Sequence, residues 1–157
     1  MGGDRCGVPA GGDPVIICQP KEEIAAFVAA TQGQNEPWGE YTALGLLRHG
    51  ALVAGVIYNH FGGAGVCAHI GAIPGGRWMT RGFLHAMFDY PFGQLGKRRI
   101  TALVSRKNRR ARRFAENLGF KYEGTVRHAL QTDDLILYGM LREECRFLPR
   151  DEMRRAA

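Results

Sequence analysis

Three consecutive apolar runs in the first half of the chain constrain its fold more than any other feature. Turn signals at His49-Gly50 and Gly62-Gly63 separate them. The predicted strands cover residues 41–47, 52–60 and 66–73. In the middle run both alternating sets of side chains are mostly apolar, which is typical of a sheet covered on both sides. The pattern therefore predicts an antiparallel meander with other elements packed above and below it.

The rest of the chain supplies elements that can cover this sheet or extend it. Apolar positions spaced by three and four residues predict helices over 21–32, 80–90 and 108–118. Short apolar runs predict further strands over 15–18, 100–104, 122–128 and 135–141. The predicted order is β-α-β-β-β-α-β-α-β-β. This is a mixed α/β (α+β) fold with a mostly antiparallel sheet and helices on both faces.

The chain of 157 residues shows no linker or repeat, so we expect one domain over 15–148. The glycine-rich residues 1–14 are expected to be a flexible tail, and 149–157 a short C-terminal tail. No apolar run reaches the ~20 residues that cross a bilayer, and no signal-peptide pattern opens the chain. We therefore expect a cytoplasmic protein without membrane contact. It is expected as a monomer or homodimer, with an exposed stretch Cys145–Leu148 available to a partner chain.

The charge balance narrows the class of partner. The net charge is +6 and the isoelectric point is about 9.5, which favours polyanions. Nucleic acid, an acidic protein and a phosphate-rich cofactor all meet that description. The four cysteines form no CxxC pair, so neither a zinc site nor a disulfide framework is expected.

Two segments are candidates for binding phosphate. Residues 74–82 contain glycines and two arginines just before a predicted helix, whose N-terminal amides favour an anion. This loop is either a pyrophosphate cradle or a turn with surface arginines. Six of the eight residues from 106 to 113 are basic. They form a phosphate clamp, a nucleic-acid patch, or only a solvated helix face.

The second half of the chain resembles a known family. The pattern Asn108-x-x-Ala111-x-x-Phe114-x-x-x-Leu118-Gly119-Phe120-x-x-Glu123-Gly124 is similar to the signature of GNAT acetyltransferases. Residues 90–100 and 134–141 resemble the ribosomal-protein N-terminal acetyltransferase branch, and small GNAT-like proteins of phage or prophage type are similar in the same stretches. The likeness follows the element order over 15–145 and is specific over 90–141.

The resemblance implies an acyltransferase that moves an acetyl group from acetyl-CoA to a primary amine, by direct attack in a ternary complex. Acetyl-CoA would lie in a splay between the parallel strands that end near 73 and run over 100–104. The acceptor would be a small-molecule or peptide amine. The implied cofactor-binding residues follow the strand, the loop and the basic helix: Ile70, Ala72, Ile73, Gly76, Arg77, Trp78, Met79, Thr80, Arg81, Gly82, Asn108 and Arg113.

The sequence departs from the family where proton transfer is concerned. Ala115 holds the place of the usual tyrosine acid, Met79 holds the place of a loop glycine, and the usual glutamate base is missing. His69 is the candidate general base, because histidine titrates near neutral pH; the alternative is a core histidine. Tyr138 is the candidate acid or else a packing tyrosine. Direct attack with water carrying the protons is also open.

The acceptor side is marked by three residues that, by resemblance, border the acceptor groove: Trp38, Glu40 and Tyr41. They are otherwise a packed tryptophan and an exposed carboxylate beside a strand. Two further functions stay open. One is a non-catalytic GNAT-like module that binds CoA or nucleic acid through its basic surface, although aromatic side chains do not alternate with the basic run as single-strand binders require. The other is an enzyme that uses a longer acyl-CoA.

Overall fold

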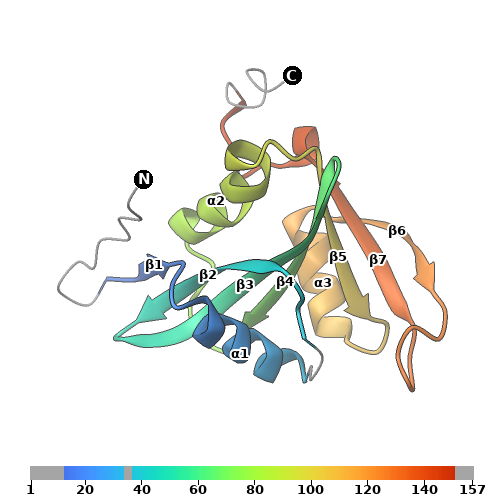
Figure 1. The fold of residues 1–157 in the computed structure, drawn as a ribbon, viewed down its shortest axis with the longest axis horizontal. Helices are drawn as coiled ribbons and strands as arrows, with labels where there is room; N and C mark the ends of the chain where they lie inside the picture. Colours follow the sequence, from blue (N-terminus) through green and yellow to red (C-terminus); the bar gives the residue numbers. More distant parts are fainter. Residues whose placement is uncertain (1–12, 34–36, 151–157) are drawn as a thin grey trace. The chain divides into compact units, whose positions relative to one another are not determined.

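The computed structural model describes residues 13–33 and 37–150 (Figure 1). Hydrogen-bonded neighbours in this part of the chain form a seven-stranded sheet in the order β1-β2-β3-β4-β5-β7-β6. β4 and β5 run parallel, whereas β1–β2, β2–β3, β5–β7 and β6–β7 pair antiparallel. This confirms the predicted mixed, mostly antiparallel fold. Most of both predicted tails lies outside the described residues.

Each predicted strand and helix is present, with ends within two residues of the expected ones. The elements are β1 (Val15–Ile17), α1 (Lys21–Gln32), β2 (Tyr41–Arg48), β3 (Ala51–Gly62), β4 (Gly65–Ala72), α2 (Arg81–Asp89), η1 (Tyr90–Gln94), β5 (Arg99–Ser105), α3 (Arg109–Leu118), β6 (Lys121–Val126), β7 (Leu135–Leu141) and η2 (Arg142–Glu144). The π-helical turn η1 was not predicted. There the Leu95 N–H bonds to the Tyr90 carbonyl, five residues back.

The described residues divide into two compact units. The first contains residues 13–33, 37–59 and 69–87, and the second contains 60–68 and 88–150. The chain passes from one unit to the other within β3, β4 and α2. None of the described helices is long and apolar enough to cross a membrane.

In the first unit, helices cover both faces of β3. Ile24 and Val28 of α1 are fully buried, and a methyl group added at Gly55 would lie 2.9 Å from the Val28 side chain. The helix can therefore approach the sheet closely because Gly55 has no side chain. Three positions further along, on the opposite face, the buried Tyr58 hydroxyl donates to the Met87 carbonyl of α2 at 2.6 Å. The expectation of a sheet covered on both sides is confirmed here.

In the second unit, β5, β7 and β6 form a continuous ladder, and β4 joins β5 through Gly65–Arg99, Val66–Ile100 and Cys67–Thr101. Helix α3 buries Ala115 and Leu118 and ends, as predicted, at Gly119, which is left-handed with φ 107°.

The second unit also overturns one expectation. Cys145 and Leu148 are 2% and 7% exposed, and the Phe147 ring stacks on Phe88 at 4.9 Å. The prediction of an exposed stretch Cys145–Leu148 for a partner chain was wrong, because η2 turns these apolar side chains back onto their own unit. A short turn of this kind leaves no periodic pattern from which its direction can be read.

Candidate active site

The predicted site residues fall in both units. The first unit holds the acceptor-side residues, the candidate base and the loop: Trp38, Glu40, Tyr41, His69, Ile70, Ala72, Ile73, Gly76, Arg77, Trp78, Met79, Thr80, Arg81 and Gly82. The second unit holds Asn108, Arg113 and Tyr138. In residues 13–33 and 37–150, no three His, Cys, Asp or Glu side chains are grouped to hold a metal ion.

The loop from β4 to α2 leads to an exposed helix N-terminus. The Thr80 hydroxyl accepts from the Phe83 N–H at 3.1 Å, and the Thr80 carbonyl accepts from the Leu84 N–H at 3.0 Å. Thr80 is therefore the N-cap of α2. The amides of Arg81 and Gly82 precede the first intrahelical donors, and both residues are exposed. The start of α2 can thus donate to an anion from its backbone.

Arg48, at the end of β2, holds this loop in shape, and sequence reasoning missed it. Its Nη2 donates to the Arg77 carbonyl at 2.9 Å. Arg77 has a left-handed backbone with φ 47°, an uncommon conformation for a residue with a side chain. The Arg48 Nε is buried and has no hydrogen-bond partner among the described residues. An arginine at a strand end looks like an ordinary surface residue in a sequence, so only the fold connects it with the loop.

His69 lies in a polar contact that the sequence did not indicate. Its Nε2 is 2.9 Å from the Asn59 Oδ1, and Asn59 is only 3% exposed. The Asn59 Nδ2 donates to the Trp38 carbonyl at 3.1 Å. The Trp38 ring lies against the imidazole, with centroids 4.9 Å apart and planes tilted by 54°. The structure therefore joins Trp38 and His69, which were predicted separately, through an unpredicted buried amide.

Glu40 directly precedes β2, whose first residue is Tyr41. The Lys21 ammonium lies 4.6 Å from the centre of the Tyr41 ring and donates to the Tyr41 carbonyl at 3.3 Å. Burial and the nearby Glu22 carboxylate raise the pKa of Tyr41. The ring face of Tyr41 therefore already accommodates an ammonium group. Glu40 is exposed.

The end of α1 contacts the strand segment expected to pair with a cofactor. The Gln32 Nε2 donates to the Ile70 carbonyl at 2.9 Å. At Gly71 an added side chain would collide with Thr31, so α1 also approaches the strand closely there. A carbonyl has two lone pairs, so the bond from Gln32 leaves Ile70 able to accept another.

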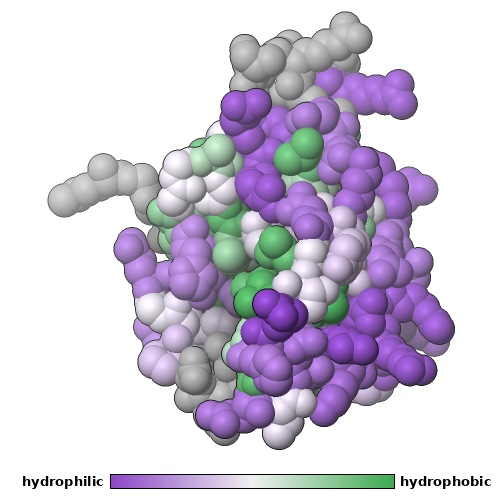
Figure 2. All heavy atoms as spheres, turned by 90° about the vertical axis from the view of Figure 1, so that its right-hand side faces the viewer, coloured by the Kyte–Doolittle hydropathy of each residue, from purple (hydrophilic) through white to green (hydrophobic). Residues whose placement is uncertain are grey.

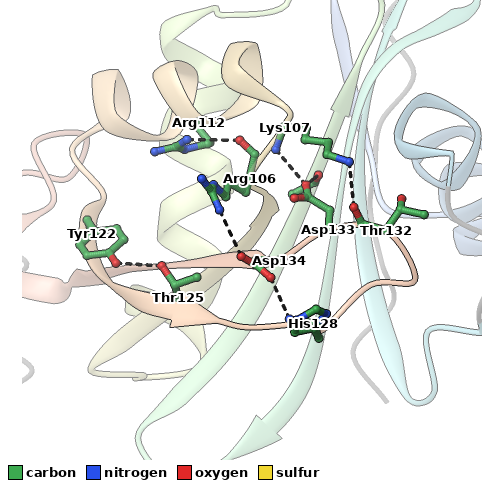
Figure 3. Close-up of polar contacts among 10 residues, drawn as sticks. Arg106, Lys107, Arg112, Tyr122, Thr125, His128, Thr132, Asp133 and Asp134 are labelled. Atoms are coloured by element: carbon green, nitrogen blue, oxygen red, sulfur yellow. Dashed lines mark hydrogen bonds and ion pairs between the residues drawn. The ribbon is translucent and has the colours of Figure 1, made fainter.

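In the second unit, the basic run divides into an anchored half and an exposed half. Figure 3 shows the anchored half, where two aspartates before β7 hold the turn before α3. The Asp133 carboxylate accepts from the Ser105 hydroxyl and, at 2.9 Å, from the Lys107 N–H. Asp134 accepts from the His128 N–H at 2.8 Å and forms an ion pair with Arg106 at 3.4 Å. These contacts lower the pKa of both carboxyl groups.

The exposed half covers the outer side of α3. Arg109, Arg110 and Arg113 are exposed, and with Phe114 and Asn117 they line a shallow hollow of about 300 Å³. Asn108 precedes them as the N-cap of α3, because its Oδ1 accepts from the Ala111 N–H at 3.1 Å. Figure 2, which views the β6 side of Figure 1, shows a mostly hydrophilic surface with a small hydrophobic area near its centre. The three exposed arginines make the hollow cationic.

Tyr138 is held by the same helix. Its hydroxyl donates to the Glu116 carboxylate at 2.9 Å and accepts from the Arg112 Nε at 3.3 Å. Burial, and the Glu116 carboxylate that accepts its proton, raise the pKa of Tyr138, while the bond from Arg112 opposes this. These contacts favour the packing role that the sequence left open over the role of an acid.

Known proteins match this chain in structure alone. No protein-family model and no curated protein matches its sequence. A variant of the spermidine N-acetyltransferase SpeG from Vibrio cholerae matches with a TM-score of 0.70 and 14% identity, over 88% of this chain and 98% of that chain. A structure assigned to the GNAT family of acetyltransferases, from Desulfovibrio desulfuricans, matches with a TM-score of 0.65 and 18% identity, over 82% and 99%.

The chain has the GNAT fold. The same likeness extends to a dodecameric spermidine N-acetyltransferase from Vibrio cholerae, with a TM-score of 0.68 and 14% identity over 83% of this chain. At identities this low, the structural matches establish the fold only. The chemistry has to be argued from the residues of this chain. In the first unit, the residues to be considered are those of the capped start of α2 and of the Trp38–Asn59–His69 contact.

Proposed function

We propose that the chain is an N-acetyltransferase that moves an acetyl group from acetyl-CoA to a primary amine by direct attack in a ternary complex. Its support is the GNAT fold, which this chain shares with acetyltransferases over most of their length. One observation carries the proposal furthest. In the first unit, β4 leads from His69, a residue able to accept a proton, directly into the loop and the capped N-terminus of α2.

The residues present suit the cofactor. The amides of Arg81 and Gly82, with the loop residues from Gly76 to Thr80, would hold the pyrophosphate, because helix N-termini favour anions. The backbone of Ile70, Ala72 and Ile73 would pair with the pantetheine arm. Asn108 and Arg113 would contribute from α3, through an amide donor and a cation for the 3′-phosphate. Bound acetyl-CoA supplies the activated thioester, and the chain supplies orientation and proton transfer.

The acceptor is proposed to enter beside Trp38, Glu40 and Tyr41. The Lys21 ammonium on the Tyr41 ring supports this, since it demonstrates contact between that aromatic face and a cationic amine. The likeness to the N-terminal acetyltransferase branch supports a peptide amine as acceptor. The SpeG structures are named for spermidine, which makes a free polyamine the other acceptor to test.

The test is calorimetry with acetyl-CoA at moderate salt. The wild-type protein is expected to bind with micromolar affinity, the order of magnitude usual for enzyme ligands. Arg81→Ala keeps the backbone amide but removes the exposed guanidinium beside it, and the loss of that cation should weaken binding by about tenfold, the value of one lost hydrogen bond to a charged group. Arg98→Ala removes an exposed arginine outside the loop and should bind like the wild type. Equal affinity in both variants would contradict the assignment of the loop.

A second function has its own observation. The hollow beside Arg109, Arg110 and Arg113 suits a polyanion, and it supports a non-catalytic module that binds nucleic acid through α3. That function predicts binding to DNA or RNA that weakens steeply with salt and with alanine at the three arginines. Such binding, together with no detectable affinity for acetyl-CoA, would replace the acetyltransferase proposal.

A further inference from the structure

We propose that Arg48 is a positioning residue for the cofactor, because its guanidinium holds Arg77 in the left-handed conformation and so fixes the loop from β4 to α2. The consequence for acetyl-CoA rests on the proposed function, in which this loop holds the pyrophosphate. The contact itself rests on the geometry of the first unit. Arg48 is assigned no contact with the cofactor and acts through Arg77.

The first step is how the sheet directs Arg48 toward the loop. Arg48 is the last residue of β2. The register of β2 with β3 shifts just before Leu47, where Val53 is an extra residue in β3. A bulge of this kind re-aims the side chains beside it. The Val53 carbonyl accepts from the Ile73 N–H at 3.0 Å, so the loop begins beside the bulge, at the end of the sheet where Arg48 lies.

The second step is the contact between the two arginines. The Arg48 Nη2 donates to the Arg77 carbonyl at 2.9 Å. Arg77 has a φ of 47°, a conformation that is uncommon outside glycine and in which asparagine, aspartate and histidine are enriched, but not arginine. The bond from Arg48 therefore stabilises a backbone conformation that Arg77 alone does not favour.

The third step is the path from this contact to α2. The Trp78 carbonyl accepts from the Thr80 N–H at 2.8 Å, and the Thr80 hydroxyl accepts from the Phe83 N–H at 3.1 Å. These bonds join the residue after Arg77 to the N-cap and first turn of the helix. Because a peptide unit is planar, fixing the Arg77 carbonyl also fixes the plane from which Trp78 continues. The contact with Arg48 thus determines how the loop enters α2.

The fourth step is that this contact is unfavourable for stability. Among the described residues, the Arg48 Nε is buried and has no hydrogen-bond partner. A buried donor of this kind has lost its water without a replacement, which destabilises the fold. The left-handed Arg77 is a second unfavourable feature of the same contact. Unpaired buried groups and unusual backbone conformations are typical of functional sites, so they indicate a role in binding and not in folding.

Arg48→Met separates positioning from folding. Methionine keeps an unbranched stem and has no N–H. The variant loses one hydrogen bond, but it also removes the unpaired donor and releases Arg77, so its free energy of unfolding in urea should not fall below that of the wild type. Its Kd for acetyl-CoA should rise about tenfold, because a free arginine disfavours the left-handed conformation to about that degree. A variant that is less stable than the wild type would show that Arg48 is only structural.

A second measurement needs no cofactor. It is the nuclear Overhauser effect between the amide proton and the Hα of Arg77, which is strong at positive φ because the two protons are then closer. Arg77 should give the strong signal in the wild-type protein and a weaker one in Arg48→Met. His128, with a φ of 51° in the second unit, should give the strong signal in both. An unchanged Arg77 signal in the variant would overturn the proposal.

A double-mutant cycle tests whether Arg48 acts through Arg77. Glycine adopts positive φ about as readily as negative φ, so Arg77→Gly makes the bond from Arg48 dispensable. In that background Arg48→Met should weaken acetyl-CoA binding by less than about threefold, against about tenfold in the wild-type background. An equal loss in both backgrounds would show that Arg48 does not act through Arg77. Arg98→Met, at an exposed position of the second unit, is the matched control and should change neither the affinity nor the Arg77 signal.

The two proposals can fail separately. A wild-type protein that binds no acetyl-CoA contradicts the proposed function, and the Arg77 signal and the urea denaturation still test what Arg48 does to the loop. A wild-type protein that binds acetyl-CoA, with an Arg48→Met variant that binds it equally well, contradicts the role of Arg48 and leaves the proposed function standing.

Discussion

At the scale of single residues, Asn108 is first of all a helix cap. The family resemblance predicts that Asn108 contacts the cofactor. In the structure, its Oδ1 accepts from the Ala111 N–H. The two roles are compatible, since the Nδ2 of the same amide still has hydrogens to donate.

Asn108→Ala should therefore lower the free energy of unfolding by about 1 kcal/mol, the usual value of a lost N-cap. Asn108→Ser keeps a capping oxygen and should lose much less. The two variants are compared by urea denaturation and then by calorimetry with acetyl-CoA. If the amide also binds the cofactor, the serine variant will be stable yet bind more weakly. An alanine variant as stable as the wild type would contradict the capping role.

Single residues also mark where sequence reasoning reaches its limit. His69 could be selected because it is the titratable group in an apolar strand. Asn59 and Arg48 could not, because one polar residue at a strand end has no spacing pattern and gains meaning only from its neighbour in space. A partial signal existed for Asn59, which lies a few residues before the Gly62-Gly63 turn as His69 lies a few residues after it.

At the scale of elements, local patterns predicted the strands and helices well because each depends on neighbours within a few residues. The close packing of α1 on β2 and β3 was not predicted, although glycines in both strands make it possible. An added methyl group at Gly45 would lie 2.9 Å from Leu52 and 3.1 Å from Ile24. From the sequence alone, such glycines are expected to weaken a strand. Their role in helix packing becomes visible only once the position of the helix is known.

Gly55→Ala tests this packing. The new methyl group would lie 2.9 Å from Val28 and 3.0 Å from Ile24, so the variant should lose about 1–3 kcal/mol of stability, the usual cost of overpacking. In a double-mutant cycle, Val28→Ala should recover part of that loss because it removes the closer contact. Gly62→Ala is the matched control, since an added methyl group there meets nothing within 4 Å. Equal stabilities for the Gly55 and Gly62 variants, measured by urea denaturation, would contradict the packing argument.

At the scale of the whole molecule, the net charge of +6 was read from composition, but its arrangement was not. Three of the six basic residues hold the local structure together. Arg106, Lys107 and Arg112 bond to groups beside β7 or on it. A sequence shows that a run is basic without showing which members bond to neighbouring groups. The partners Asp133 and Asp134 lie more than twenty residues away, in a turn whose direction the sequence pattern did not reveal.

These aspartates predict how the stability of the whole protein depends on pH. The Ser105 hydroxyl, followed by the Lys107 N–H, lowers the pKa of Asp133 in the folded state below its unfolded value of about 3.9. A carboxyl group of this kind stabilises the fold above the unfolded pKa, and the contribution disappears as the pH falls through the lower folded pKa. Asp133→Ala should therefore lower Tm at pH 7, and the difference from the wild type should shrink as the pH falls below about 4. Thermal unfolding followed by circular dichroism between pH 2 and pH 7 provides the measurement.

Glu143→Ala, at an exposed carboxylate of η2, is the control and should change Tm little at any pH. A difference between wild type and Asp133→Ala that stays constant down to pH 2 would show that the lost contribution does not depend on ionisation.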